Sequence, residues 1–172
     1  AVEGKTLAEH QNFGASYHFV ENIDGGQYQT CNMAYKKKSL VSVGMFNEKY
    51  SLAYEDIDLA LRVKREGKIV FCKEMLVFHK LVPWSPKHLF LNARRGKYKV
   101  LLVKEHDYQK VLTFRILEVN SLIQVLCPFL IPFYYRLKSV DDLLILPVIY
   151  ARAVLHRLVV WKTAIEEKIF IL

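Results

Sequence analysis

The sequence predicts an α/β domain followed by a helical tail. Short apolar runs alternate with turn residues and charged stretches over residues 1–111. One amphipathic helix stands out at residues 55–66, and residues 112–172 are richer in Leu, Ile, Val and aromatic residues. We therefore expect two parts, with the boundary between residues 111 and 112.

The amino-acid composition indicates which classes of molecule the chain is expected to bind. The chain has 172 residues, a formal net charge of +8 and 52% hydrophobic residues. The basic excess favours anionic partners such as phosphorylated small molecules or lipid head groups. Nucleic acid is not expected, because the sequence has no helix-turn-helix, zinc pattern or RNA-binding aromatic signature. The three cysteines are far apart, which argues against a thiolate metal site or a disulfide framework and fits a reducing, cytoplasmic setting.

Turn signals divide the beginning of the first part into short elements. Residues 21–27 read as a loop with a Gly-Gly turn, and residues 28–34 are expected to form a short strand. A short helix is expected over residues 37–43, ending at Gly44. Residues 46–54 show no regular pattern.

The clearest expected element is the helix over residues 55–66. Its apolar residues recur at helical spacing, acids crowd its first turn and bases its last, and Gly67 follows as a natural end. Asp58 and Arg62 stand at i,i+4, a favourable pair that we interpret as structural.

Two short strands and a second helix are expected after this helix. The strands cover residues 69–72 and 76–78, with two charged residues between them. Pro83 and Pro86 mark a loop, and residues 88–106 read as a basic helix.

Five short motifs follow one another between residues 32 and 79. A strand leads to an Asn and a basic residue, a Gly-Met-Phe turn follows, a helix begins Glu-Asp-x-Asp-Leu, and a strand ends in His. The segments are Asn32-Met33-Ala34-Tyr35-Lys36, Val43-Gly44-Met45-Phe46-Asn47-Glu48, Tyr54-Glu55-Asp56-Ile57-Asp58-Leu59-Ala60-Leu61-Arg62, Gly67-Lys68-Ile69-Val70-Phe71 and Val77-Phe78-His79. In this order they resemble the C-terminal catalytic segment of family 2 glycosyltransferases, which have the GT-A fold; Met45 and Asn47 depart from the family's Gly-Gly-Phe-Asp-Glu turn.

The resemblance implies an inverting transfer of a sugar from a nucleotide-sugar donor to an acceptor hydroxyl. It implies Asp56 as the base that deprotonates the acceptor and Glu55 as its neighbour in acceptor positioning. The alternative is that both are only helix-start acids, which are common in a first turn.

His79 is the expected metal ligand. The imidazole at the end of a strand could hold a divalent cation, Mn²⁺ or Mg²⁺, that binds the diphosphate of the donor. The alternative is a hydrogen-bonded histidine at a strand edge.

Three further residues are expected to bind substrate. Asn32 could contact donor or acceptor, although Asn at a strand end is often only a turn former. Trp84, in a loop after His79, could stack on a sugar or anchor at a bilayer. Arg94 matches an arginine of a family helix, whereas Arg95 departs from the family's Asn there.

The resemblance also implies that the chain is incomplete. The family's donor-binding half, with its metal-binding Asp-x-Asp, has no counterpart before Asn32, so we expect the chain to be inactive alone. The acceptor is expected to be a saccharide or lipid-linked saccharide, in synthesis of cell-surface polysaccharide or glycolipid. The alternative function is that of a non-catalytic, basic, membrane-associated fragment or binding module.

The tail favours attachment to a membrane surface. Residues 119–135 carry no formal charge but include two prolines and are short for a span, which needs about 20 residues. Residues 143–162 read as a helix with a wide apolar face and a basic side that holds Arg152, His156 and Arg157. This pattern predicts a helix in the interface at the cytoplasmic face of the membrane; a true span or a helix packed on the domain are the alternatives.

Overall fold

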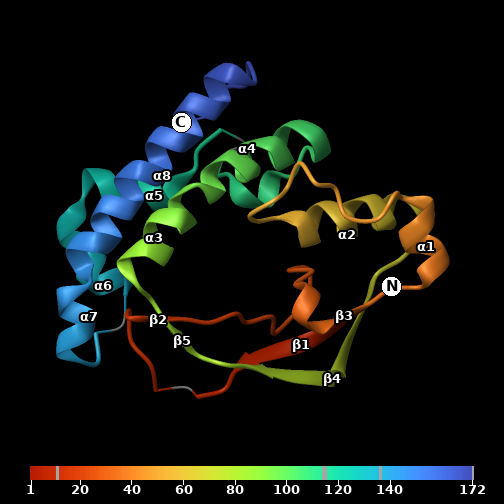
Figure 1. The fold of residues 1–172 in the computed structure, drawn as a ribbon, viewed down its shortest axis with the longest axis horizontal. Helices are drawn as coiled ribbons and strands as arrows, with labels where there is room; N and C mark the ends of the chain where they lie inside the picture. Colours follow the sequence, from red (N-terminus) through yellow and green to blue (C-terminus); the bar gives the residue numbers. More distant parts are fainter. Residues whose placement is uncertain (11, 114–115, 136, 172) are drawn as a thin grey trace. The chain divides into compact units, whose positions relative to one another are not determined.

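A computed structural model describes residues 1–10, 12–113, 116–135 and 137–171. It shows a mixed α/β protein with a small mixed sheet and C-terminal helices, which confirms the expected class at this level (Figure 1). The chain forms two compact units. Unit 1 consists of Ala1–Gln11 and Phe19–Val82, and unit 2 of Asn12–His18 and Pro83–Leu172. This division lies earlier than the expected boundary after residue 111, because the helices after Pro83 pack on the C-terminal helix.

The sheet of unit 1 is centred on a strand that sequence patterns did not indicate. β1 (Val2–Ala8) pairs antiparallel with β3 (Met33–Ala34) and parallel with β4 (Val70–His79). The two strands expected at residues 69–72 and 76–78 are a single strand whose register with β1 shifts after Gly4. The charged pair between them thus forms an irregularity within β4, not a turn.

Asn32 hydrogen-bonds to backbone carbonyl oxygens beside this irregularity of the sheet. Its side-chain amide donates to the carbonyl oxygens of Lys5, at 2.8 Å, and Met75, at 2.9 Å. Gly4 is required beside it, because an added Cβ would lie 2.4 Å from both the Asn32 amide nitrogen and the Met75 oxygen. Backbone carbonyls displaced by the bulge are therefore satisfied by a side chain.

The helices of unit 1 follow the expected boundaries closely. α1 (Lys37–Ser42) ends before Gly44, whose φ is 78°, and α2 spans Glu55–Glu66. The expected strand at residues 28–34 is wrong in its first part: Tyr28 has a φ of 58°, and η1 (Thr30–Asn32) is a 3-10 helix. Two side-chain interactions take the place of sheet pairing in this segment. A buried carboxylate accepts from the backbone N–H of Tyr28, and the Asn32 amide donates to the backbone of β1.

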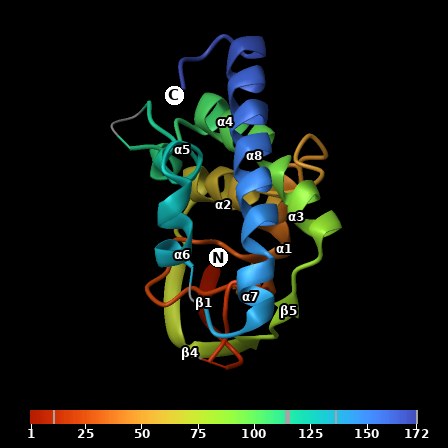
Figure 2. The same cartoon turned by 90° about the vertical axis from the view of Figure 1, so that its left-hand side faces the viewer.

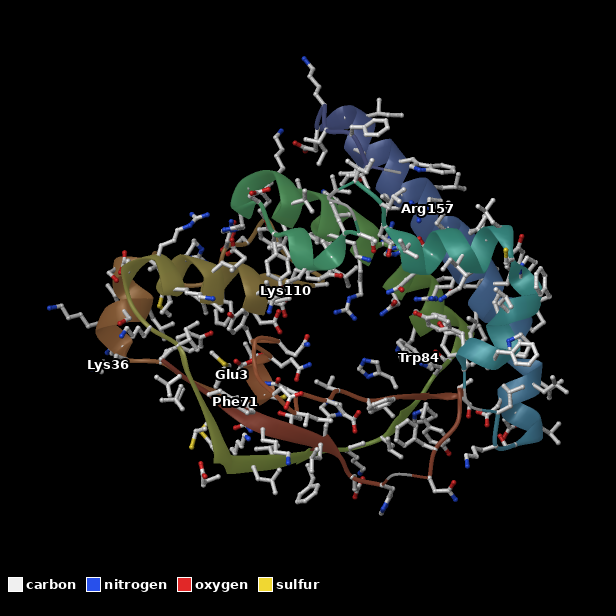
Figure 3. All side chains as sticks on the ribbon, turned by 180° about the vertical axis from the view of Figure 1, so that it is seen from behind. Glu3, Lys36, Phe71, Trp84, Lys110 and Arg157 are labelled. Atoms are coloured by element: carbon white, nitrogen blue, oxygen red, sulfur yellow. The ribbon has the colours of Figure 1, made fainter. Side chains whose placement is uncertain are left out.

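That buried carboxylate belongs to Glu3 on β1, labelled in Figure 3. Its side chain accepts hydrogen bonds from the backbone N–H groups of Gly26, Gln27 and Tyr28 and from the Asn22 amide, at 2.6–2.9 Å. Glu3 is only 2% exposed. A single acid therefore organises loop 22–28, because backbone donors replace the water that burial removes.

Unit 2 is built around a long helix. α8 (Leu146–Glu166) packs against α3 (Pro86–Ala93), α4 (Arg95–His106) and α5 (Val119–Leu126), and Figure 2 shows these helices along its length. The shorter elements are β2 (Tyr17–His18), β5 (Val82–Pro83), η2 (Gln109–Val111), η3 (Pro128–Leu130), α6 (Ile131–Tyr134) and α7 (Val140–Leu144).

The expected helix at residues 88–106 is two helices, α3 and α4, which meet at Arg94. A close approach to α8 explains this arrangement. A Cβ at Gly96 would lie 2.9 Å from a methyl carbon of Val160 and 3.1 Å from the His156 carbonyl oxygen. The glycine therefore lets α4 rest directly on α8.

Asp142 explains why residues 12–18 belong to unit 2. One carboxylate oxygen accepts from the Ser16 N–H at 2.7 Å and from its hydroxyl at 2.6 Å; the other accepts from the N–H groups of Lys138 and Ser139. Burial alone would raise the pKa of Asp142, but these hydrogen bonds outweigh it and lower the pKa to about 2. The carboxylate thus ties an N-terminal loop to the start of α7.

Candidate functional site

The N-terminus of α2 presents the two acids expected to act on the acceptor. Tyr54, just before the helix, has a φ of 68°, and Glu55 and Asp56 occupy the first turn, half-buried. Asp56 Oδ1 accepts from the N–H of Ile57 at 2.8 Å. A helix N-terminus holds such carboxylates in place through its free N–H groups and dipole.

Asp58, the third acid of this turn, is engaged as a structural group. Its Oδ2 accepts from Arg62 Nε at 3.0 Å and Nη2 at 2.6 Å, while Arg62 Nη1 donates to the Val43 carbonyl oxygen at 2.5 Å. The interpretation of this pair as structural is thus supported. Asp58 is 1% exposed, so the pair is not the surface ion pair that the spacing alone would indicate.

Three buried polar atoms in unit 1 have no hydrogen-bond partner among the described residues: Gln29 Oε1, Glu55 Oε2 and the Tyr35 hydroxyl. Burial raises the pKa of Tyr35 to about 12, and the charges of Asp56 and Glu3 and the Tyr28 ring hydroxyl add to the shift. The phenol therefore stays protonated and remains a hydrogen-bond donor. An unsatisfied buried donor and acceptor are the features that a polar ligand would complete.

Asn32 is placed differently from the expectation. It is 7% exposed, and both of its amide hydrogens go to carbonyls of β1 and β4, as described above. Its position serves the sheet, and its role toward a substrate stays a prediction.

His79 ends β4 opposite Ala8, the last residue of β1, so it lies at the carboxyl edge of the parallel pair. The backbone of Glu9 donates to its carbonyl oxygen at 2.9 Å, and its ring Nδ1 lies 2.9 Å from the Lys80 carbonyl oxygen. Ligand sites of α/β sheets lie at this edge. The position is compatible with metal binding by His79, which stays a prediction.

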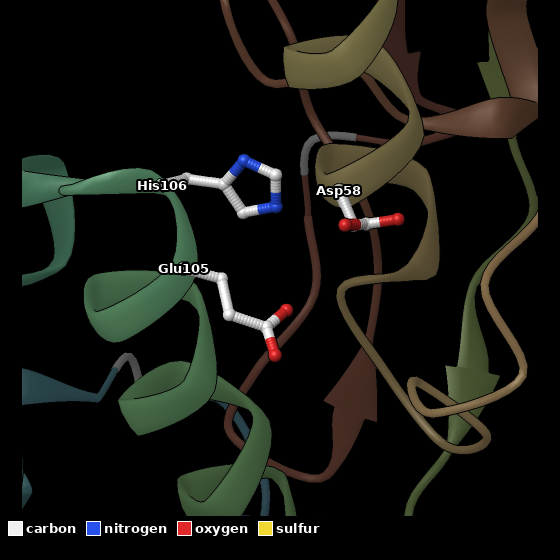
Figure 4. Close-up of side chains that lie close together, drawn as sticks. All are labelled: Asp58, Glu105 and His106. Atoms are coloured by element: carbon white, nitrogen blue, oxygen red, sulfur yellow. The ribbon is translucent and has the colours of Figure 1, made fainter. Parts of the chain in front are cut away.

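Figure 4 draws three other side chains of the kinds that ligate divalent cations: Asp58, Glu105 and His106. Asp58 belongs to α2 in unit 1, and Glu105 and His106 end α4 in unit 2. Because they belong to separate units, we assign them no common metal site. The expected Mn²⁺ or Mg²⁺ remains tied to His79.

Trp84 and Arg94 lie in unit 2. The Trp84 ring meets His18 edge-on, with ring centroids 4.9 Å apart, and the backbone N–H of Trp84 donates to the Ser16 carbonyl oxygen at 2.7 Å. Trp84 also packs against a buried cluster that includes Leu89. Trp84 therefore lies in the short loop before α3, as expected, and is packed there. Arg94 is exposed at the junction of α3 and α4, and both substrate roles stay predictions.

Unit 2 contains a buried ion cluster that sequence reasoning missed. Glu118, 2% exposed, lies 2.8 Å from Lys99 Nζ and 3.0 Å from Arg157 Nη2, and also accepts from Ser121. Burial alone would raise the pKa of Glu118, but Lys99, through charge and a hydrogen bond, and Ser121 outweigh it and lower the pKa to about 2. Figure 3 labels Arg157 among these helices.

His156 lies in the same region and is kept neutral. Burial lowers its pKa from 6.5 to about 4, and the charge of Lys99 adds to this effect, while Glu118 opposes it. Its ring Nδ1 lies 3.1 Å from the Ala93 carbonyl oxygen. No spacing rule relates Glu118 to Lys99 and Arg157, so only the helix packing could bring them together.

No protein-family model, curated protein or solved structure matches this chain. The resemblance to family 2 glycosyltransferases therefore rests on the motif residues themselves, and what it implies is carried forward as a proposal.

Proposed function

We propose that this chain is the acceptor-side part of a GT-A glycosyltransferase of family 2. It would move a hexose from a nucleotide-sugar to a hydroxyl of a saccharide or lipid-linked acceptor, in synthesis of cell-surface polysaccharide or glycolipid. The observation that carries the proposal is the first turn of α2: Asp58 is neutralised by Arg62, whereas Glu55 and Asp56 stand ahead of it, with Glu55 Oε2 buried and unpartnered among the described residues.

Asp56 would act as general base in a single displacement. Its carboxylate takes the proton of the acceptor hydroxyl as that oxygen bonds to the anomeric carbon. The bond from the anomeric carbon to the donor phosphate breaks, the nucleoside diphosphate leaves with the electron pair, and the configuration inverts. Glu55 would hold the acceptor by accepting a second hydroxyl hydrogen, and the protonated Tyr35 could donate to a ligand oxygen.

A divalent cation, when bound, would neutralise charge on the leaving diphosphate. His79 fits as one ligand, because its imidazole stands half-buried at the carboxyl edge of the β1–β4 pair. The donor phosphates and residues outside this chain would supply the other ligands. If His79 is a ligand, replacing it should weaken the dependence of transfer on Mn²⁺; an unchanged metal titration would reject this role.

The test is sugar transfer by this chain and by a version extended upstream, with Mn²⁺ and UDP-, GDP- or dTDP-sugars. We expect activity only in the extended version and a fall of about 10²–10⁴-fold in kcat for Asp56→Asn. Asp24→Asn, in the exposed turn of the same unit, is the matched control and should retain activity. Retained turnover in Asp56→Asn, with unchanged thermal unfolding, would reject Asp56 as the base.

A second candidate function is a non-catalytic, membrane-associated binding module. The observation that favours it is the apolar outer face of unit 2, described next. Silence of both chain versions toward all three classes of nucleotide-sugar would make this candidate the better account.

A further inference from the structure

The basic side of α8 is turned into the protein. Arg157 is 1% exposed and bound to Glu118; His156 is 8% exposed and contacts the Ala93 carbonyl oxygen. Arg152 donates to Gln124 Oε1 at 3.2 Å and to Asn92 Oδ1 at 3.4 Å. The expectation of a helix that shows these three residues to solvent or head groups is thus replaced by the reverse orientation.

The basic side chains on the inner side of α8 contact acceptors inside unit 2 and so do not reach its outer side. Glu118 pairs with Arg157 and Lys99 at 3.0 and 2.8 Å, and Gln124 and Asn92 each accept a hydrogen bond from Arg152. These contacts hold the basic side chains of α8 inside the unit, although Arg152 Nε and Arg157 Nε and Nη1 have no hydrogen-bond partner among the described residues. The outer surface of the same helices should then be apolar.

The outer surface is apolar in the described residues of α5 to α8. Large hydrophobic side chains stand exposed on these neighbouring elements, and a water-facing surface rarely carries so many together. The most exposed, with their exposed fractions, are Phe133 86%, Ile165 78%, Val140 72%, Leu144 69%, Leu126 68% and Phe129 68%. Helices α5, α6 and α7 each contact α8, so these side chains belong to one packed group of helices.

The length of the apolar segment and the lysines near its ends indicate a lipid bilayer as the partner of this surface. Residues Val140–Glu166 are long and apolar enough to cross a membrane, with a mean hydropathy of 1.8 over their most apolar window. Exposed lysines lie at both ends of the segment: Lys138 precedes it, Lys162 lies near its end with a side chain 74% exposed and pairs with Glu166 at 3.8 Å, and Lys168 follows. Lysines beside an apolar surface complement the anionic head groups of a leaflet.

We propose that the outer surface of α5–α8 inserts into one leaflet of an anionic bilayer, with α8 lying in the interface and not crossing it. Crossing is disfavoured because α8 packs along α3, α4 and α5, and its buried Arg157 is paired with Glu118 and, through it, with Lys99 on α4. A span would pull this paired cluster into hydrocarbon or break it. The inserted surface would reach about 5–10 Å into the head-group and acyl boundary.

Flotation with lipid vesicles tests the proposal on the 172-residue chain without any sugar donor, so its outcome is independent of the proposed transferase activity. We expect the chain to float with vesicles of equal phosphatidylcholine and phosphatidylglycerol. Phe133→Asp and Ile165→Asp should each lower vesicle partitioning roughly tenfold or more. Val41→Asp on α1, where Val41 is 61% exposed in unit 1, is the matched control and should float like the original chain.

The depth of insertion can be read from Trp161, which is 39% exposed on α8. In a Trp84→Phe variant it is the only tryptophan of the chain. We expect stronger quenching by lipids brominated near the head group than by lipids brominated near the chain ends, and release by alkaline carbonate. Retention in carbonate with deep quenching would overturn the interfacial placement in favour of a span.

Two other outcomes would overturn the proposal. A lipid-free dimer that Phe133→Asp or Ile165→Asp dissociates, with no flotation, would assign the surface to a second copy of the chain. Equal partitioning onto pure phosphatidylcholine vesicles would overturn the anionic preference. The circular dichroism spectrum and thermal unfolding of the Phe133→Asp, Ile165→Asp and Val41→Asp variants should match the original chain, because these side chains are exposed.

Discussion

Glu3 in unit 1 and Glu118 in unit 2 are each 2% exposed, yet they are stabilised in opposite ways. Backbone N–H groups and the Asn22 amide surround Glu3, whereas Lys99, Arg157 and Ser121 surround Glu118. The first carboxylate is bound by uncharged donors and orders a loop. The second is bound by charged side chains of two other helices, α4 and α8, and holds them inside.

The difference shows what each unit does with a buried charge. In unit 1, Glu3 orders loop 22–28 through hydrogen bonds from uncharged groups and forms no part of an ion cluster among the described residues. In unit 2, Glu118 holds Lys99 and Arg157 inside, and the exposed side of the helices carries large apolar side chains. Variants of the two carboxylates and their neighbours can separate these roles.

The largest effect is expected for Glu118→Gln. The change leaves Lys99 and Arg157 buried without a counter-charge, so unit 2 should lose about 3–5 kcal/mol of stability. Hydrogen exchange of the α8 amides measures this loss. Glu166→Gln is the control, because its pair with Lys162 at 3.8 Å is exposed and should change stability by less than about 0.5 kcal/mol. A Glu118→Gln effect no larger than that of the control would contradict a role for the cluster.

Acidification should also act on unit 2. The pKa of His156 falls from 6.5 to about 4 on folding, so between these values the unfolded chain binds a proton that the folded chain does not. Stability should therefore fall as pH drops from about 7 to 5, with a slope of at most about 1.4 kcal/mol per pH unit. His156→Gln should reduce the dependence of stability on pH. His88→Gln, on the exposed first turn of α3, should leave that dependence unchanged. An unchanged slope in His156→Gln would assign the effect elsewhere.

A smaller effect is expected for Glu3→Gln in unit 1. The substituted amide offers one acceptor oxygen and places an N–H donor against backbone donors, so unit 1 should lose about 1–3 kcal/mol. Faster hydrogen exchange should appear first at Gly26, Gln27 and Tyr28. Glu9→Gln, at an exposed acid just after β1, is the control. Unchanged exchange in the loop would show that other contacts order it.

The smallest effect is expected for Asn32→Ala, at about 1–2 kcal/mol, because two carbonyls at the irregularity of β4 lose their donor. Urea unfolding of unit 1 measures it. In the extended enzyme, the KM values for donor and acceptor should change little if Asn32 serves only the sheet. A large rise in KM with unchanged stability would restore the substrate-binding role that the motif implies.

Local signals in the sequence determined several elements of the fold. Acids before an apolar periodic stretch, bases after it and Gly67 at its end defined α2 from Glu55 to Glu66, and Gly44, with its φ of 78°, marked the end of α1. The pairing of Asp58 with Arg62 also followed from i,i+4 spacing. These features depend on neighbours within one or two helical turns, so a linear pattern contains them.

Contacts between distant residues were decided only by the tertiary structure. β1 is a central strand because β3 and β4 flank it, although Val2–Ala8 has no strong strand pattern of its own. Asn32 serves the sheet because a register shift leaves carbonyls within its reach, and the basic side of α8 faces inward because Glu118 lies there. A helical pattern shows which residues share a face, but the partner that covers the face comes from elsewhere in the chain, and the free energy of burying charge then decides its direction.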